Sequence, residues 1–219
     1  MLSRVLEAEV MDTEADAADY DAMDFSAVNA VFAEDFLKSF GPSSGSILDI
    51  GTGTARIPIE IAKRSPSITI TAADLSPSML AVGKRNVERA GLSERITLEL
   101  VDAKGMPFHN ASFTAVVSNS IVHHIPDPTS FFREAIRLVK PGGLLFIRDL
   151  FRPADRKTLD QLVETYAGND TPHQRQLFAD SLNAALTVGE VQSLVSSFGM
   201  SPATVTATSD RHWTWIARK

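Results

Sequence analysis

The chain has 219 residues, 44% of them hydrophobic, and a formal net charge of −6 at pH 7. This length suits one core domain with an appended segment, and the acidic balance argues against a nucleic-acid partner, which would need clustered Lys and Arg. The absence of cysteine excludes disulfides and thiolate metal sites, and because we find neither a signal peptide nor a long apolar run, we expect a cytoplasmic protein without a membrane segment.

The acidic residues are concentrated at the start of the chain. Residues 1–40 contain ten acidic and two basic side chains, a net charge of −8. Within it, residues 7–23 are too acidic to form a core, although the segment favours helix. We therefore expect residues 1–45 to form a helical lid segment, with a mobile tail as the alternative.

From residue 46 onward, short apolar runs alternate with amphipathic stretches, a pattern typical of βα units with a mostly parallel sheet. Ser76-Pro77 is a helix N-cap followed by Pro at the first helical position, and Gly91 marks the end of that helix. The apolar spacing of residues 131–140 predicts another helix, which stops at Pro141. Five strands are predicted, at residues 46–50, 68–74, 96–103, 113–120 and 143–150.

The remainder of the chain is predicted to complete the same domain, residues 46–219. Residues 152–186 have helical spacing broken by Gly168 and Pro172, which predicts two helices that cover the sheet. Thr187 and Glu190 form a capping box that begins one more helix. The last 16 residues alternate apolar and polar positions around a turn, which predicts a closing hairpin.

A glycine loop follows the first predicted strand, in the sequence ILDIGTGTAR. Gly51 and Gly53 let the backbone approach a ligand without a Cβ between them. A dinucleotide-binding loop would have a third glycine at the position of Arg56, so the dinucleotide fingerprint fails. Asp49 precedes the glycines and would repel a pyrophosphate but attract an ammonium group.

Polar residues also follow the next strands, where an open α/β sheet binds its ligand. Asp74 lies about 20 residues after the glycine loop, where a carboxylate can accept both hydroxyls of a ribose. Asp102 follows the third strand, with a loop cap as its alternative role, and Asn119 ends the fourth. Together with Asp49, these residues predict an adenosine that carries a zwitterionic amino-acid group.

These motifs resemble those of the class I S-adenosylmethionine-dependent methyltransferases, from about residue 46 to the C-terminus. The matching stretches are ILDIGTGTA, TAADLSPSML, VDAKGMPF, SNSIVHHIPDP and LVKPGGLLFIRD. One departure is Ala55, where the family frequently has a third glycine. The resemblance implies an α/β, Rossmann-like fold with a seven-stranded, mostly parallel sheet, helices on both faces and an antiparallel last strand. It also implies S-adenosyl-L-methionine as cofactor and a small-molecule methyl acceptor.

The resemblance also assigns roles to residues at the matching positions. Asp49 would engage the methionine amino group, Asp74 the ribose and Asp102 the adenine amine. Tyr20 would come from the lid and contact the methionine portion with its ring and hydroxyl. The full set of expected cofactor residues is Tyr20, Asp49, Gly51, Thr52, Gly53, Asp74, Leu75, Met79, Asp102, Ala103 and Asn119.

His123 occupies a position that this family often uses to face the acceptor, and its ordinary pKa suits a general base near neutral pH. A structural role is the alternative. A metal pair with His124 is disfavoured because adjacent histidines are expected to point apart and no acid lies at a helpful spacing, so we predict no metal. Further candidates for acceptor binding are His124, Arg148, Asp149, Arg211 and His212.

Two other functions remain open at this point. A nicotinamide-dependent oxidoreductase would need the glycine that Arg56 replaces, and a non-catalytic S-adenosylmethionine-binding module would share every motif. The sequence does not determine the acceptor, the atom that is methylated or the oligomeric state.

Overall fold

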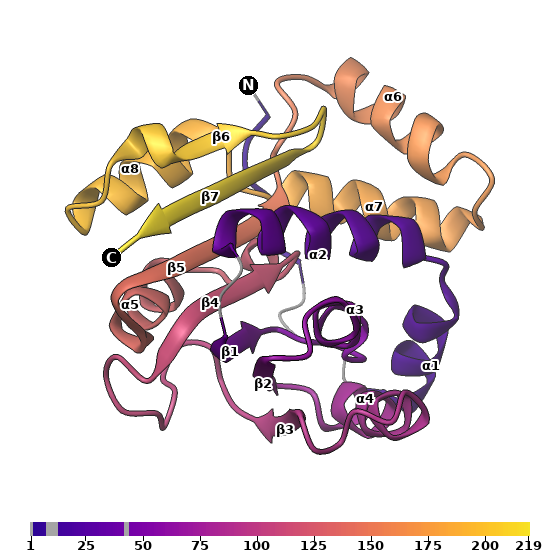
Figure 1. Ribbon diagram of the computed structural model, residues 1–219. Coiled ribbons are helices and arrows are strands. Elements are labelled where there is room, and N and C mark those ends of the chain that lie inside the picture. Colours follow the sequence, from indigo (N-terminus) through magenta and orange to yellow (C-terminus); the bar gives the residue numbers. More distant parts are fainter. Residues whose placement is uncertain (1, 8–12, 42–43) are drawn as a thin grey trace. The chain divides into compact units, whose positions relative to one another are not determined.

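The computed structural model describes residues 2–7, 13–41 and 44–219 (Figure 1). These residues form a seven-stranded sheet in the order β3-β2-β1-β4-β5-β7-β6. β1 pairs in parallel with β2 and β4, β2 pairs in parallel with β3, and β6 and β7 are antiparallel. The predicted Rossmann-like fold class is confirmed. The strands are β1 (Gly45–Ile50), β2 (Ile68–Asp74), β3 (Ile96–Leu100), β4 (Phe113–Asn119), β5 (Val139–Leu150), β6 (Val205–Ala207) and β7 (His212–Arg218).

The helices occur where the local signals predicted them. Ser76 accepts a hydrogen bond from the Met79 N–H (3.1 Å) at the start of α4, and Gly91 follows that helix with φ of 68°. None of the described helices has the length and apolar character needed to cross a membrane. The helices are α1 (Glu14–Ala22), α2 (Ser26–Phe40), α3 (Arg56–Arg64), α4 (Pro77–Arg89), α5 (Thr129–Leu138), α6 (Arg156–Ala167), α7 (Pro172–Ala184) and α8 (Val188–Ser197), with short 3₁₀ turns η1 (Val122–His124) and η2 (Pro202–Thr204).

Some predicted boundaries are wrong. The third strand was expected over residues 96–103, but β3 ends at Leu100. The helix over residues 131–140 was expected to reach Lys140, but α5 ends at Leu138 and β5 begins at Val139. The residue before a proline is disfavoured in helical conformation, and Lys140 precedes Pro141. Gly142 and Gly143 then exchange backbone hydrogen bonds with Lys219 (2.7 and 3.1 Å), which extends the strand through the predicted turn.

The described residues divide into two compact units. Unit 1 comprises residues 2–7, 120–129 and 148–215, and unit 2 comprises residues 13–41, 44–119, 130–147 and 216–219. The predicted lid, residues 1–45, contributes α1 and α2 to unit 2, while its residues 1, 8–12 and 42–43 lie outside the described part. Its function as a lid stays a prediction.

Unit 2 is built around buried strands and the helices next to them. Phe32 and Phe36 of α2 pack edge-on against Phe146, with ring centroids 5.2 and 5.8 Å apart. Strands covered on both faces are expected to be nearly continuous apolar runs, and Ile47 and Leu48 of β1 are both fully buried. α1 lies beside α4 (Figure 1), so this helix has a defined place in unit 2.

Unit 1 has its own apolar cluster. Leu159 and Leu162 of α6 and Leu182 of α7 pack together, and Leu2 contacts the same cluster. The two helices predicted for residues 152–186 are thus present, broken near Gly168 and Pro172. The capping box at the start of α8 and the closing hairpin of β6 and β7 are present as well.

Candidate cofactor site and histidine network

The loop after β1 has the positive φ angles that its glycines predict. Gly51 and Gly53 have φ of 75° and 54°, a region that glycine adopts without steric cost. The Gly53 N–H donates to Asp74 Oδ2 (2.7 Å), which ties the loop to the end of β2. A Cβ placed on Gly53 would lie 3.6 Å from Cε1 of Tyr20, so the tyrosine ring lies against this loop.

Ala55 occupies the position where the family frequently has glycine. It has φ of 60° and is completely buried. A Cβ on Gly83 of α4 would lie 3.3 Å from the Ala55 Cβ, so only small residues fit where this loop meets α4. Arg56, at the position of the third dinucleotide glycine, instead forms an ion pair with Asp21 of α1 (2.8 Å).

Asp49 provides the strongest electrostatic signal in unit 2. The residue is 2% exposed, and its Oδ2 has no hydrogen-bond partner among the described residues. Burial raises the pKa of Asp49 to about 7, an effect that the Thr52 hydroxyl opposes and the charge of Asp74 reinforces. A buried carboxylate without a partner is costly, and a cationic ligand such as an ammonium group would remove that cost.

Several of the predicted residues line one cavity. The cavity has a volume of about 330 Å³. Among the residues that line it are Tyr20, Asp49, Gly51, Thr52 and Asn119. This cavity therefore joins the glycine loop, the end of β4 and the N-terminal helix α1, which are the regions expected to hold the methionine portion.

Asp74 is joined to the glycine loop by its bond to Gly53, although neither of these two residues lines the cavity. Its Oδ1 accepts the Ser76 N–H (2.9 Å). Burial raises the pKa of Asp74, while the N–H groups of Ser76, Gly53 and Leu75 lower it. Each carboxylate oxygen can accept more than one hydrogen bond, so ribose hydroxyls could still bind here.

The remaining predicted cofactor residues do not line the cavity. Leu75 is 38% exposed, and Met79 is buried in a cluster with Ala17. Asp102 accepts the Lys104 N–H (2.8 Å) and pairs with the Lys104 ammonium (3.1 Å), and half-buried Ala103 follows it. The structure thus groups the residues expected at the methionine end more closely than those expected at the adenine end.

In unit 1, His123 belongs to a buried network. Its Nδ1 lies 2.5 Å from Asp149 Oδ1, and its backbone N–H donates to Asp149 Oδ2 (3.1 Å). Burial lowers the pKa of His123, but Asp149 and then Glu7 outweigh this effect and the pKa is raised. The other ring nitrogen, Nε2, faces Glu7 Oε1 at 3.5 Å. Neither nitrogen faces open space in this arrangement.

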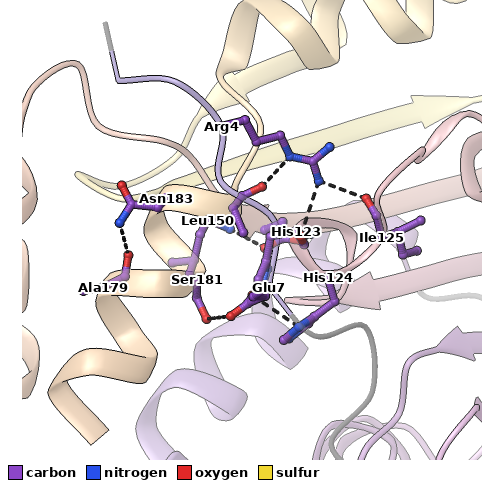
Figure 2. A network of polar contacts seen from close by, with 11 residues as sticks. Arg4, Glu7, His123, His124, Ile125, Leu150, Ala179, Ser181 and Asn183 are labelled. Carbon is purple, nitrogen blue, oxygen red and sulfur yellow. Dashed lines mark hydrogen bonds and ion pairs between the residues drawn. The ribbon is translucent and has the colours of Figure 1, made fainter. Parts of the chain in front are cut away.

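The expectation that the adjacent histidines point apart is wrong. The rings of His123 and His124 lie 4.2 Å apart between centroids, because the 3₁₀ turn η1 carries both. Glu7 meets them from the N-terminal segment, with Oε1 3.2 Å from His124 Nδ1 (Figure 2). No local sequence signal identifies Glu7, since it is far from the histidines along the chain.

The other acceptor-side candidates have partners within unit 1. Arg148 Nε donates to the Thr214 hydroxyl (2.9 Å), and the guanidinium of Arg211 lies 3.4 Å over the ring of Tyr166. Burial and then the charge of Arg211 lower the pKa of His212 to about 4, so this imidazole is neutral at pH 7. Of the predicted acceptor-side residues, the structure gathers His123, His124 and Asp149.

Asp21 is a second residue that the sequence did not single out. Its carboxylate accepts from Arg56 of α3 and from the Asn86 side-chain amide of α4 (2.9 Å), and Asn86 also donates to the Thr54 carbonyl (3.0 Å). Asp21 lies in α1 directly after Tyr20, so these bonds fix the helix that presents the tyrosine to the loop.

Comparison with known proteins agrees with this arrangement. Residues 48–147 match a family model described as a methyltransferase domain. The ubiquinone/menaquinone biosynthesis C-methyltransferase UbiE of Geotalea daltonii is 32% identical over 111 residues, which cover 50% of this chain and 47% of that protein. The chain thus matches about half the length of this curated relative.

Two solved structures show the same fold. One, assigned as an S-adenosylmethionine-dependent methyltransferase of Methanococcus maripaludis, has a TM-score of 0.78 and 23% identity, covering 100% of this chain and 97% of that chain. The plantazolicin methyltransferase BpumL, in complex with a monoazolic desmethylPZN analog and SAH, has a TM-score of 0.71 and 16% identity, covering 93% and 89%.

Residues 48–147 match the methyltransferase-domain model, and the seven-stranded sheet is the fold of the two solved methyltransferase structures. S-adenosylmethionine is the cofactor that the sequence resemblance implies for these residues. The residues present fit it, because the unpartnered Oδ2 of Asp49 matches an ammonium group beside a loop with little side-chain bulk.

Proposed function

We propose that this chain transfers the methyl group of S-adenosylmethionine to a small-molecule acceptor. The observation that carries the proposal is that Asp49 lines the cavity of unit 2 while its buried Oδ2 has no hydrogen-bond partner among the described residues. The dinucleotide alternative is weaker, because the position of its third glycine is filled by Arg56 in an ion pair with Asp21.

This chain's own residues would bind and orient the cofactor. Asp49 would accept the methionine ammonium, Asp74 would accept the ribose hydroxyls, and Tyr20 would cover the loop and exclude water. When bound, the cofactor supplies a methyl group on a sulfonium, which is a good leaving group, so catalysis depends mainly on positioning.

The acceptor is proposed to be small. The net charge of −6 disfavours nucleic acid. The relative UbiE is named for the biosynthesis of quinones, and BpumL for plantazolicin. The sequence predicted His123 as the base, but its Nδ1 is held by Asp149 and its Nε2 faces Glu7, so the proposed function does not depend on that role.

Calorimetry with S-adenosylmethionine tests the proposed cofactor site. Loss of a hydrogen bond to a charged group costs about 1.5–3 kcal/mol, so Asp49→Asn should weaken binding about tenfold to a hundredfold. Asp19→Asn, which removes an exposed carboxylate from the neighbouring helix α1, is the matched control and should bind as the parent does. Equal affinities in Asp49→Asn and the parent would contradict the proposal.

Methyl transfer from labelled S-adenosylmethionine to a panel of small acceptors, including quinols and azole-containing peptides, tests turnover. We expect labelled product with at least one acceptor and a lower rate in Asp49→Asn. Cofactor binding without turnover on any acceptor would support a non-catalytic binding module instead.

A further inference from the structure

We propose that Glu7, His123 and His124 of unit 1 bind one divalent cation of the zinc class. Each residue offers one ligand atom, and the three atoms all lie within 4.8 Å of one another. Figure 2 shows Glu7 approaching the turn that carries both histidines. All three residues belong to unit 1, whereas the cofactor cavity is lined by residues of unit 2, and the proposal does not rest on the proposed function.

Two of the three distances between the ligand atoms are close to those around a bound ion, and the third is within 4.8 Å. Glu7 Oε1 lies 3.2 Å from His124 Nδ1 and 3.5 Å from His123 Nε2. A tetrahedral zinc ion with bonds of about 2.0–2.2 Å places its ligand atoms about 3.3–3.6 Å apart. Two imidazole nitrogens and one carboxylate oxygen are a known zinc ligand set, which leaves a fourth position for water.

Glu7 provides a second, independent observation. Its Oε1 is buried and has no hydrogen-bond partner among the described residues, although two imidazole nitrogens lie close to it. No ring N–H of the two histidines is therefore directed at Glu7 Oε1. An ion between the three ligand atoms would supply this oxygen with a partner. The other oxygen, Oε2, accepts from the Ser181 hydroxyl (3.3 Å), which holds the carboxylate in place.

His123 is already oriented as a metal ligand. Histidines that bind metals commonly donate their second ring N–H to a carboxylate, which fixes the tautomer and the ring orientation. Here Asp149 Oδ1 lies 2.5 Å from Nδ1, so a neutral His123 with its proton on Nδ1 would have the lone pair of Nε2 available to an ion beside Glu7. A cation at Nε2 would occupy the nitrogen that a general base would use, so the two roles of His123 exclude each other.

The N-terminal segment that carries Glu7 is also held in place. Arg4 donates to the carbonyls of Ala184 (2.6 Å), Pro126 (2.9 Å) and Ile125 (2.9 Å). These bonds join residues 2–7 to α7 and to the chain just after the histidines. The site is therefore organised before an ion binds, and the ion would join the N-terminal segment to η1.

The test uses the full chain, stripped of metal with a chelator and dialysed, then titrated with ZnCl₂ by calorimetry. Absorption spectra with CoCl₂ report the coordination geometry without any assay of activity. We expect one Zn²⁺ per chain and a tetrahedral Co²⁺ spectrum. Glu7→Gln and His124→Asn should each weaken Zn²⁺ binding at least tenfold and abolish that spectrum.

His173→Asn is the matched control, because His173 is exposed on α7 and outside the cluster. It should bind Zn²⁺ as the parent chain does. Circular dichroism and S-adenosylmethionine affinity, expected to be unchanged in all three variants, separate loss of the metal site from misfolding and from failure of the proposed function. No Zn²⁺ binding by the parent chain, or equal binding by the parent and either cluster variant, would overturn the proposal.

Discussion

Two buried aspartates occupy equivalent positions in different units of the protein and have opposite electrostatics. Asp49 is the second-to-last residue of β1 in unit 2, and Asp149 is the second-to-last residue of β5 in unit 1. They are 2% and 1% exposed. Burial alone would raise the pKa of both carboxyl groups.

The partners of each carboxylate make the difference. Asp149 receives hydrogen bonds from His123 Nδ1 (2.5 Å), the His123 N–H (3.1 Å) and the Leu150 N–H (2.6 Å). Burial raises its pKa, but His123 and the backbone donors outweigh burial and the pKa is lowered. Asp49 lacks a partner at Oδ2 among the described residues, and its pKa rises to about 7. The first carboxylate is used by the fold, whereas the second is available to a ligand.

The largest effect is expected from removing the partnered aspartate. Asp149→Ala leaves the buried imidazole of His123 without its carboxylate, and breaking a buried charged pair costs about 3–5 kcal/mol of unfolding free energy. Asp49→Asn removes a carboxylate whose burial is uncompensated, so its unfolding free energy should change by less than about 1 kcal/mol. Urea unfolding of both variants without cofactor measures the two losses of unfolding free energy. Equal losses would show that the fold does not depend more on Asp149 than on Asp49.

Asp74 lies between these extremes, because the fold uses its oxygens and a ligand is also expected to bind them. Asp74→Ala should weaken S-adenosylmethionine binding by about 1–3 kcal/mol, through loss of charge-assisted hydrogen bonds to the ribose. Calorimetry measures this, with Asp74→Asn as the variant that keeps one acceptor oxygen for the Gly53 N–H. Unchanged affinity in a folded Asp74→Ala protein would remove Asp74 from the cofactor site.

The raised pKa of Asp49 predicts a pH dependence of cofactor binding. With a pKa of about 7, the carboxyl group becomes increasingly protonated in the free protein below that pH and must release its proton when it accepts an ammonium group. Affinity should therefore rise with pH up to about 7 and fall by at most about tenfold for each pH unit below it. Calorimetry between pH 5.5 and 7 measures the slope, which Asp49→Asn should abolish and Asp19→Asn should retain.

The smallest effect is expected from the hydroxyl of Tyr20. Tyr20→Phe keeps the ring against the glycine loop and removes one hydrogen-bonding group, which is worth about 0.5–1.5 kcal/mol. S-adenosylmethionine affinity should fall about twofold to tenfold, and Tyr20→Ala should lose more because the ring also covers the loop. If Tyr20→Ala binds as the parent does, the lid prediction fails for this residue.

The parts of the fold that depend on local chemistry were predictable. The apolar runs of β1, β2 and β4, the Ser76-Pro77 start of α4 and the capping box of α8 are signals contained in a few adjacent residues. The end of α5 was missed by two residues, although the proline after Lys140 is itself a local signal.

The candidate cofactor site was only partly predictable. Its glycine loop and the aspartates at the strand ends follow from spacing, because parallel strands bring their carboxyl ends to one edge of a sheet. The bonds that Asp21 receives from Arg56 and Asn86 could not be predicted, since they join three helices that are separate in the sequence.

By itself, the sequence determined the order of strands and helices and the residues of the glycine loop, because these depend on periodicity, capping and backbone conformation over short stretches. Tertiary structure alone decided that Asp149 would accept hydrogen bonds from His123 and Leu150. It likewise decided that Asp49 Oδ2 would have no hydrogen-bond partner among the described residues. It also decided that Glu7 would meet His123 and His124. The physical reason is that the pKa of a buried carboxylate depends on which donors the fold places around it, and those donors come from segments that no local pattern connects.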